Sequence, residues 1–295
     1  MKQTRTQDPV ALKRLTTFHI GGQPLLYVRP ENYIELRASL SLCRRRNLPF
    51  RVLGGGSNLL VGDGPLPFAV IHVCAPGFAW IKRIGPATMK VGAGIRMRRL
   101  LRYCEREGLG GLEFMAGIPG TIAGALVGNA GAWGRSMGQV IRRAWRFDDE
   151  LGKVETPVED MGLGYRTSRL GGLIITEVEI ELEPRSPELV ARMARRYAIE
   201  KARRHPMNAR SAGCVFKNPP GLSAGKVLDI CGFKGVRVGG AQVSPVHANF
   251  ICNIADASEE DVLQLIDRMR RKAHDVLGVD LELEIKHWSP ESKVA

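Results

Sequence analysis

Two glycine-rich segments constrain the fold of this chain more than any other feature of its sequence. The first covers residues 54–58, reads Gly-Gly-Gly-Ser-Asn, and follows a short apolar run at 50–53 that is typical of a buried strand. The second lies within residues 114–133, where glycine recurs at Gly120, Gly124 and Gly128. Glycine is needed where a backbone turns sharply or closely approaches a ligand. The chain therefore contains two places where main-chain groups can meet a bound molecule.

Backbone N–H groups in such turns, or at a helix N-terminus, suit the diphosphate of a nucleotide or dinucleotide. Neither segment matches the known fingerprints, however. The GxGxxG pattern fails at its final position, which is Leu59, and no GxxxxGK[ST] P-loop is present. The spacing alone leaves FAD, another nucleotide and a purely structural turn as open interpretations.

The uncharged segment 114–133 has the small-residue spacing of a membrane helix pair. Pro119, Asn129 and the density of glycine make it a poor spanning helix, and favour a loop that leads into a short helix. The formal charge of +13 raises the question of nucleic acid. Because the basic residues occur in short scattered clusters without interleaved aromatics, we do not expect nucleic-acid binding. We also expect no membrane insertion, and a monomer.

The rest of the chain is a mixture of helices and strands. Periodicity and capping signals predict helices at 31–47, 97–107, 186–204 and 258–278, and strands at 50–53, 69–73, 88–91, 144–148, 173–182 and 279–285. The composition changes near residue 186, where a smaller C-terminal domain is expected to begin. The six cysteines form no CxxC pair, which indicates reduced thiols, no metal site and a cytoplasmic location.

Seven ordered motifs resemble one known family over nearly the entire chain. They lie at 15–22, 52–60, 116–125, 165–168, 211–219, 247–250 and 281–285, and they are similar to the UDP-N-acetylenolpyruvoylglucosamine reductases. The short segment 168–173 leaves no room for a long substrate-covering loop, so the chain resembles the shorter subtype of that family.

The resemblance implies an α+β, FAD-binding fold of the vanillyl-alcohol-oxidase (PCMH) type with a C-terminal α+β substrate domain. The implied domains are a first FAD-binding subdomain at 1–75, a second at 76–185, and the substrate domain at 186–295, whose last strand packs back toward the active site. The resemblance further implies that FAD is bound noncovalently, that NADPH is the hydride donor, and that the substrate is a UDP-sugar of peptidoglycan synthesis carrying an enolpyruvyl group.

The resemblance also implies roles for individual residues. Arg166 stabilises the charge on the substrate carboxylate, Glu284 is a protonated partner that donates a hydrogen bond, and Cys214 delivers a proton to carbon. Tyr165, Lys217 and Asn218 contact the substrate. The flavin contacts expected from the two glycine segments are Gly54, Gly55, Gly56, Ser57, Asn58, Leu59, Ile118, Pro119, Gly120, Thr121, Gly124, Asn129, Ala130 and Gly131.

The chain departs from the family pattern at two places. Cys214 stands where many relatives have serine, and His205-Pro206 stands where Gln-Pro is common. A thiol can also donate a proton, but it introduces sensitivity to thiol reagents and oxidation. Two rival functions remain: an FAD-dependent oxidase of the same fold, which does not need Arg166, Cys214 and Glu284 together, and a protein that only binds nucleotides or nucleic acid.

Overall fold

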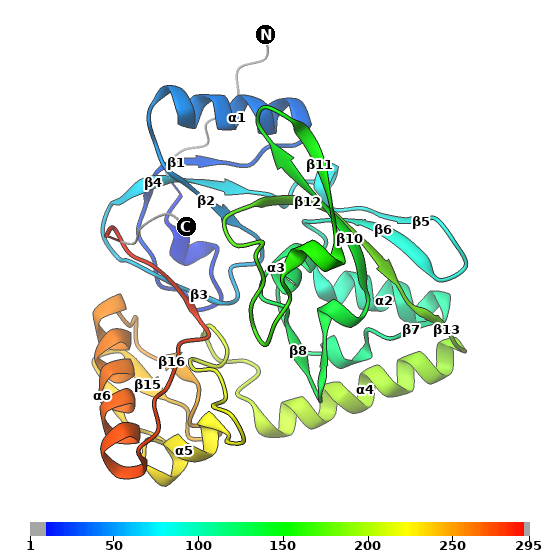
Figure 1. Ribbon diagram of the computed structural model, residues 1–295. Coiled ribbons are helices and arrows are strands. Elements are labelled where there is room, and N and C mark those ends of the chain that lie inside the picture. The colour runs from blue at the N-terminus through cyan, green and yellow to red at the C-terminus, as the bar shows by residue number, and fades with distance from the viewer. Residues whose placement is uncertain (1–9, 292–295) are drawn as a thin grey trace.

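The computed structural model describes residues 10–291 and is built around two sheets and a C-terminal unit (Figure 1). The first sheet is parallel and contains β1 (Pro24–Val28), β4 (Leu66–His72) and β2 (Phe50–Leu53), in the order β1-β4-β2. Helix α1 (Tyr33–Arg45) covers it and buries Leu36 and Leu40 in a shared core. The first glycine segment leaves this sheet at the carboxyl end of β2, which is where ligands bind to parallel sheets.

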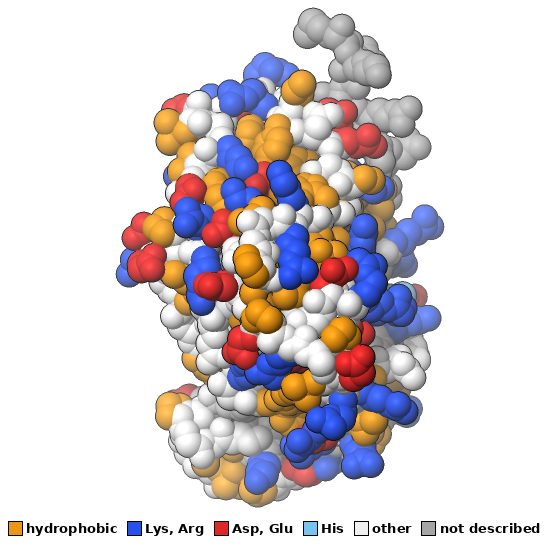
Figure 2. Space-filling model, turned by 90° about the vertical axis from the view of Figure 1, so that its right-hand side faces the viewer, with side chains coloured by type: hydrophobic (Ala, Val, Ile, Leu, Met, Phe, Trp, Pro, Cys, Tyr) orange, Lys and Arg blue, Asp and Glu red, His pale blue; other side chains and the backbone are white. Residues whose placement is uncertain are grey.

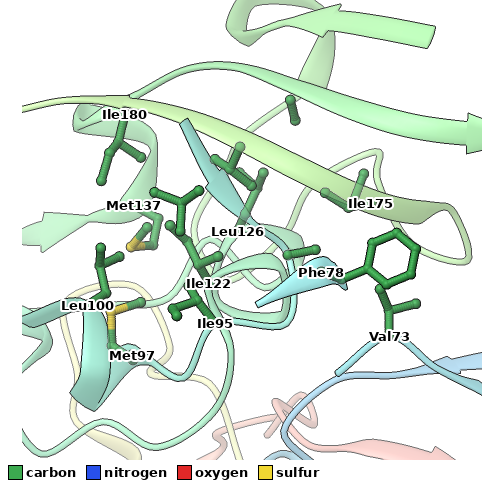
Figure 3. Close-up of a cluster of buried hydrophobic side chains, with 14 of the residues drawn as sticks. Val73, Phe78, Ile95, Met97, Leu100, Ile122, Leu126, Met137, Ile175 and Ile180 are labelled. Carbon is green, nitrogen blue, oxygen red and sulfur yellow. The ribbon is translucent and has the colours of Figure 1, made fainter. Parts of the chain in front are cut away.

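The second sheet is antiparallel, with the order β11-β10-β12-β6-β5. Its strands are β11 (Gly152–Pro157), β10 (Ile141–Asp148), β12 (Ile174–Glu181), β6 (Thr88–Gly92) and β5 (Ile81–Arg83). Helices α2 (Met97–Glu107) and α3 (Ile122–Val127) pack into the core beside it, where Leu100, Ile122, Leu126 and Ile180 point toward one another (Figure 3). The second glycine segment is therefore anchored by the buried face of α3.

The long helix α4 (Pro187–Arg204) runs from the second sheet to the C-terminal unit (Figure 1). That unit contains α5 (Ala224–Ile230), a small sheet of β14 (Arg237–Val238), β15 (Ala241–Val243) and β16 (Ile251–Asn253), and α6 (Glu259–Leu277). Its hydrophobic core also takes in Phe18, Ile20 and Leu60 from the N-terminal part of the chain. This shared core fixes the C-terminal unit against the first glycine segment.

The chain returns to the N-terminal part at its end. Strand β17 (Lys286–Trp288) pairs in parallel with β3 (Leu59–Val61), directly after the first glycine segment. The strand predicted at 279–285 is wrong, because those residues form only an isolated bridge from Leu283 to Phe216 and no continuous ladder. The alternation that suggested a strand reflects the burial of Leu281 and Ile285 in the C-terminal core.

Shorter elements complete the fold. They are the strand pairs β7 (Leu109–Gly110) with β13 (Glu183–Pro184) and β8 (Gly131–Ala132) with β9 (Arg135–Ser136), and the 3-10 helices η1 (Leu12–Arg14), η2 (Pro76–Phe78), η3 (Glu113–Met115), η4 (Met137–Gln139) and η5 (Val158–Met161). The prediction of a short helix within 114–133 is confirmed by the six residues of α3. Within residues 10–291, no helix is long and apolar enough to cross a membrane.

Charged residues are mixed on the molecular surface. Figure 2 shows Lys and Arg side chains spread over one face, with Asp and Glu side chains and apolar patches between them. Several of the arginines are paired across strands of the second sheet, such as Arg143 with Glu155 and Glu179. The excess positive charge is thus distributed over this face rather than gathered into one stripe.

Candidate active site

Arg166, Cys214 and Glu284 come from three distant segments and lie together in the structure. The Arg166 Nε atom is 3.1 Å from Oε1 of Glu284, and each of these side chains is 22% exposed. The two groups are within ion-pairing distance, but the Arg166 Nε–H has no hydrogen-bond acceptor at a good angle within residues 10–291. Cys214 is close enough to both for their charges to affect its pKa.

Cys214 and Glu284 are held side by side by main-chain hydrogen bonds. The Glu284 N–H donates to the carbonyl oxygen of Val215 over 2.8 Å, and Phe216 bridges to Leu283. The buried Asn249 side chain fixes this segment, because it accepts from the Phe216 N–H (2.9 Å) and donates to the Phe216 carbonyl oxygen (2.8 Å). A side-chain amide that binds both main-chain polar groups of one residue leaves that segment little freedom.

Arg166 is presented by a tight turn. Its φ is +56°, an uncommon left-handed conformation for a residue other than glycine. The turn is closed by the bond from the Gly164 N–H to the Thr167 carbonyl oxygen (3.1 Å). The Asn129 side chain donates to the Gly164 carbonyl oxygen over 2.8 Å, so the turn is tied to the segment that follows α3.

Burial dominates the electrostatics of the site. It raises the pKa of the Glu284 carboxyl above its ordinary value, although Arg166, Lys217 and Lys201 oppose the shift. Burial and the neighbouring Glu284 carboxyl raise the pKa of the Cys214 thiol to about 12. At neutral pH the thiol therefore keeps its proton, and burial shifts the neighbouring Glu284 carboxyl toward its protonated form. This arrangement places a guanidinium cation, a thiol that bears its proton and a carboxyl with a raised pKa around one point.

Lys201 is a fourth group at the site that sequence reasoning missed. It lies on α4, and its charge acts on Cys214, Arg166 and Glu284. Burial lowers the pKa of the Lys201 ammonium, whereas the neighbouring Arg203 and Arg204 side chains are exposed. No feature of the sequence distinguishes Lys201 from this basic run, because the distinction arises from where the end of α4 is placed.

The two glycine segments contact each other directly. A Cβ on Gly55 would lie 2.5 Å from the Gly120 Cα atom, and one on Gly54 would lie 2.7 Å from Oγ1 of Thr121. The Ser57 hydroxyl donates to the Pro119 carbonyl oxygen over 3.2 Å. Larger residues at Gly54 and Gly55 would push the segments apart, so the expected flavin contacts form one continuous surface.

That surface fits a dinucleotide such as FAD. A Cβ on Gly128 would meet only the Gly124 carbonyl oxygen within 4 Å, and one on Gly124 only the Thr121 hydroxyl, so no other segment within residues 10–291 packs on this side of α3. The N–H groups of Gly55 and Gly56 donate no hydrogen bond to an acceptor in the described part of the chain. Free main-chain donors beside a bare glycine face match the needs of a diphosphate.

The other expected contacts have varied surroundings. Both polar groups of the Asn129 side chain are used within the protein, since its Oδ1 accepts from the Gly138 N–H (2.9 Å) and its amide binds the Gly164 carbonyl. The Lys217 ammonium is 2.5 Å from Oε1 of Glu282. Ala130, Gly131, Leu59 and Ile118 adjoin the same segments as the glycines.

Tyr165 and Asn218 lie next to each other beside Arg166. The Asn218 N–H donates to the Tyr165 hydroxyl over 3.4 Å, and the Arg166 guanidinium lies 5.4 Å from the Tyr165 ring centre. Asn218 also accepts from the Ala224 N–H at the start of α5 (3.0 Å). Tyr165 is 56% exposed, so its ring is accessible beside the buried charged groups. In the part of the chain that the structure describes, no group of three or more His, Cys, Asp or Glu residues is placed to hold a metal.

Comparison with known proteins identifies two matching families of domains. Residues 24–146 match the FAD binding domain, and residues 205–288 match the C-terminal domain of UDP-N-acetylenolpyruvoylglucosamine reductase. Together these matches include both glycine segments, Cys214 and Glu284. The prediction of an α+β, FAD-binding fold is confirmed.

Whole-chain relatives carry the same name. The chain is 39% identical to a UDP-N-acetylenolpyruvoylglucosamine reductase of Syntrophotalea carbinolica over 276 aligned residues. These residues make up 93% of this chain and 91% of the relative. The chain is 40% identical to a second such reductase of Symbiobacterium thermophilum, over 94% of this chain and 90% of the relative. The crystal structure of the Thermus caldophilus reductase superposes with a TM-score of 0.83 at 37% identity, covering 95% and 98% of the two chains.

Proposed function

Because this chain belongs to the UDP-N-acetylenolpyruvoylglucosamine reductase family and is an FAD-dependent oxidoreductase, we propose that it uses NADPH to reduce the enolpyruvyl group of UDP-N-acetylglucosamine enolpyruvate. The product is UDP-N-acetylmuramate, a precursor of peptidoglycan. The observation that carries the proposal is the contact of Arg166 with Glu284, 3.1 Å between Nε and Oε1, beside Cys214. A cation, an acid and a second proton donor at one point are what this reduction requires.

FAD, when bound, accepts hydride from NADPH and supplies it to the terminal methylene of the enolpyruvyl group. In our assignment it would be held by residues 54–59, 118–121, 124 and 129–131, through the glycine surface described above. The segment that would hold the flavin adjoins Glu284, because the Asn58 side chain is hydrogen-bonded to the Glu284 carbonyl oxygen.

Addition of hydride leaves negative charge on the neighbouring carbon and its carboxylate. The Arg166 guanidinium stabilises this charge, and the protonated Glu284 carboxyl donates a hydrogen bond to it rather than repelling it. The Lys201 ammonium adds a second positive charge on the side of α4. Each of these groups is partly withdrawn from water, where its interaction with a developing charge is stronger.

The reaction is completed by a proton on carbon. The Cys214 thiol delivers it, since the raised pKa keeps the proton on sulfur until a strongly basic carbon is formed. Tyr165, Lys217 and Asn218 contact the remainder of the UDP-sugar at the exposed side of this point. We propose that the protein acts in the cytoplasm and as a monomer. Light scattering of the purified protein tests whether it is a monomer.

An anaerobic absorbance experiment tests the function. NADPH should bleach the oxidised flavin spectrum of the purified protein, and UDP-N-acetylglucosamine enolpyruvate should restore it promptly without oxygen. A flavin that stays reduced until air enters would reject this substrate and favour an oxidase of the same fold. The first half-reaction is reduction of the flavin by NADPH, and the second is its reoxidation by the enolpyruvyl substrate. The roles proposed for Arg166, Cys214 and Glu284 belong to the second half-reaction alone.

A further inference from the structure

Three successive carbonyl groups of the first glycine segment are held by other parts of the protein. The Gly54 carbonyl oxygen accepts from His72 Nε2 over 3.0 Å. The Gly55 carbonyl oxygen accepts from a guanidinium N–H of Arg96 over 3.3 Å. The Gly56 carbonyl oxygen accepts from the Thr17 N–H over 2.9 Å. The segment is therefore oriented residue by residue.

The orientation of each carbonyl fixes that of the following N–H. In a trans peptide the C=O and the N–H point in opposite directions, and no cis bond occurs within the described residues. The N–H of Gly55 thus points away from His72, and that of Gly56 away from Arg96. Neither these two N–H groups nor that of Ser57 meets an acceptor within residues 10–291. Three adjacent donors are turned away from the groups that fix them.

His72 is itself held in place by a buried tyrosine. Its Nδ1 atom is 2.7 Å from the Tyr27 hydroxyl, and each of the two residues is 5% exposed. A carbonyl oxygen only accepts, so Nε2 of His72 carries the proton that binds Gly54, and Nδ1 accepts from the Tyr27 hydroxyl. Burial lowers the pKa of His72 to about 4, in agreement with a neutral ring in which one nitrogen donates and the other accepts.

A Tyr27–His72–Gly54 chain of hydrogen bonds is more than packing requires. A buried apolar side chain at position 72 would fill the same place between β4 and the glycine segment without the cost of burying an imidazole. The two bonds act on the single peptide that leads into the glycine turn. They resemble the outer hydrogen bonds that orient ligand-binding groups in metal sites, where their loss weakens binding without touching the ligand.

We propose that His72, held by Tyr27, is a positioning residue that aims the N–H groups of the Gly54–Ser57 turn at the diphosphate of FAD. Arg96 and the Thr17 N–H orient the next two peptides in the same way. The inference depends on the assignment of FAD to this segment in the proposed function. It adds to that function two residues, His72 and Tyr27, that touch neither flavin nor substrate in this role.

The test compares FAD with riboflavin, which lacks the diphosphate, by fluorescence titration of the full chain stripped of flavin. His72→Phe should weaken FAD binding about tenfold or more, because the Gly54 peptide loses its donor. Riboflavin affinity should change less than about twofold. His72→Gln should restore most of the FAD affinity, since its amide can donate to Gly54 and accept from Tyr27. Tyr27→Phe should give an intermediate loss for FAD.

Tyr33→Phe is the matched control, because Tyr33 donates a similar bond of 2.8 Å to Glu177 at another place in the same half of the protein. It should leave FAD affinity unchanged. Equal losses of FAD and riboflavin in His72→Phe, or no rescue by His72→Gln, would assign His72 a general structural role and overturn the inference. Unchanged FAD affinity in His72→Phe overturns it while leaving the proposed function intact. A wild-type chain that binds neither ligand overturns both.

Discussion

The side-chain amide of Asn58 donates a hydrogen bond of 3.1 Å to the main-chain carbonyl oxygen of Glu284, which lies 226 residues later in the sequence. In turn, the Lys286 N–H donates a hydrogen bond of 2.9 Å to the Asn58 carbonyl oxygen. The end of the first glycine segment and the residue proposed as the acid are therefore directly joined. These two hydrogen bonds, together with the adjoining β3–β17 ladder, fix the position of the Glu284 carboxyl relative to the first glycine segment.

Replacing Asn58 should affect the second half-reaction more than the first. In Asn58→Leu the amide is lost at similar volume, and the segment carrying Glu284 is held less firmly. We expect flavin reoxidation by the enolpyruvyl substrate to slow about tenfold, while reduction by NADPH changes less than about twofold. Stopped-flow absorbance on protein saturated with FAD measures both rates.

Gln264→Leu provides the control for that change. Gln264 donates a bond of 3.0 Å to Glu260 on the exposed side of α6, so its loss removes an amide far from the site. Both half-reactions should match those of the wild type. Equal slowing of the two half-reactions in Asn58→Leu would place its effect on the flavin alone and contradict the coupling argued above.

Local signals in the sequence predicted the long helices well. Helix α2 has the predicted limits 97–107 and ends at Gly108 with φ +65°. Helix α6 starts after Ser258 with a capping box, in which the side chains of Ser258 and Asp261 each accept a hydrogen bond from the other residue's main-chain N–H. These capping signals involve residues only a few positions apart, so they can be recognised in the sequence. Strands such as β1 and β3 were not predicted, because their pairing with β4 and β17 depends on distant residues.

The residues of the site were harder to predict from short sequence patterns. Arg166, Cys214 and Glu284 entered as candidates through the resemblance of whole motifs, and the structure places them together. Their roles and the two domain boundaries, at 75/76 and 185/186, remain predictions. Lys201 and His72 were missed because their surroundings, rather than their neighbours in sequence, make them unusual. Burial of a titratable group depends on tertiary packing, which short patterns do not encode.

Cys214→Ser should preserve activity, and Cys214→Ala should not. A hydroxyl can deliver a proton to the same carbon, whereas a methyl group cannot. We expect Cys214→Ala to slow the second half-reaction by about 10²–10⁴-fold, the usual contribution of a positioned proton donor. Cys214→Ser should stay within about tenfold of the wild type. Reduction by NADPH, measured on the same samples, should be unaffected in both variants, and a loss there would argue against the assigned role.

The thiol of Cys214 should be unreactive at neutral pH. A cysteine in place of serine suggested sensitivity to thiol reagents, but burial and Glu284 raise the pKa of Cys214 to about 12, so the thiolate is scarce. Iodoacetamide at pH 7 should modify Cys214 at least about 100-fold more slowly than it modifies glutathione. Peptide mapping by mass spectrometry follows the site. Rapid labelling of Cys214 would show that the thiolate is stabilised, and it would exclude Cys214 as the proton donor.

The raised pKa of Glu284 predicts how stability depends on pH. The folded state binds this proton more tightly than the unfolded state, in which the pKa is near its ordinary value of 4.5. Stability is therefore lost as pH rises from 4.5 through the folded pKa, because the folded protein must then bury a carboxylate. Glu284→Gln removes that cost. It should raise the melting temperature at pH 8 by about 2 °C or more and leave it little changed at pH 4.

Glu282→Gln is the matched control, since Glu282 lies two residues earlier with a side chain that is 73% exposed. It removes a carboxyl from the same segment without relieving burial, so its melting temperature should run parallel to that of the wild type from pH 4 to pH 8. Thermal melts at saturating FAD compare the three proteins. If Glu284→Gln is less stable than the wild type at pH 8, the carboxyl is ionised and paired with Arg166 in the resting protein. Glu284 would then need another source for the hydrogen bond that it is proposed to donate.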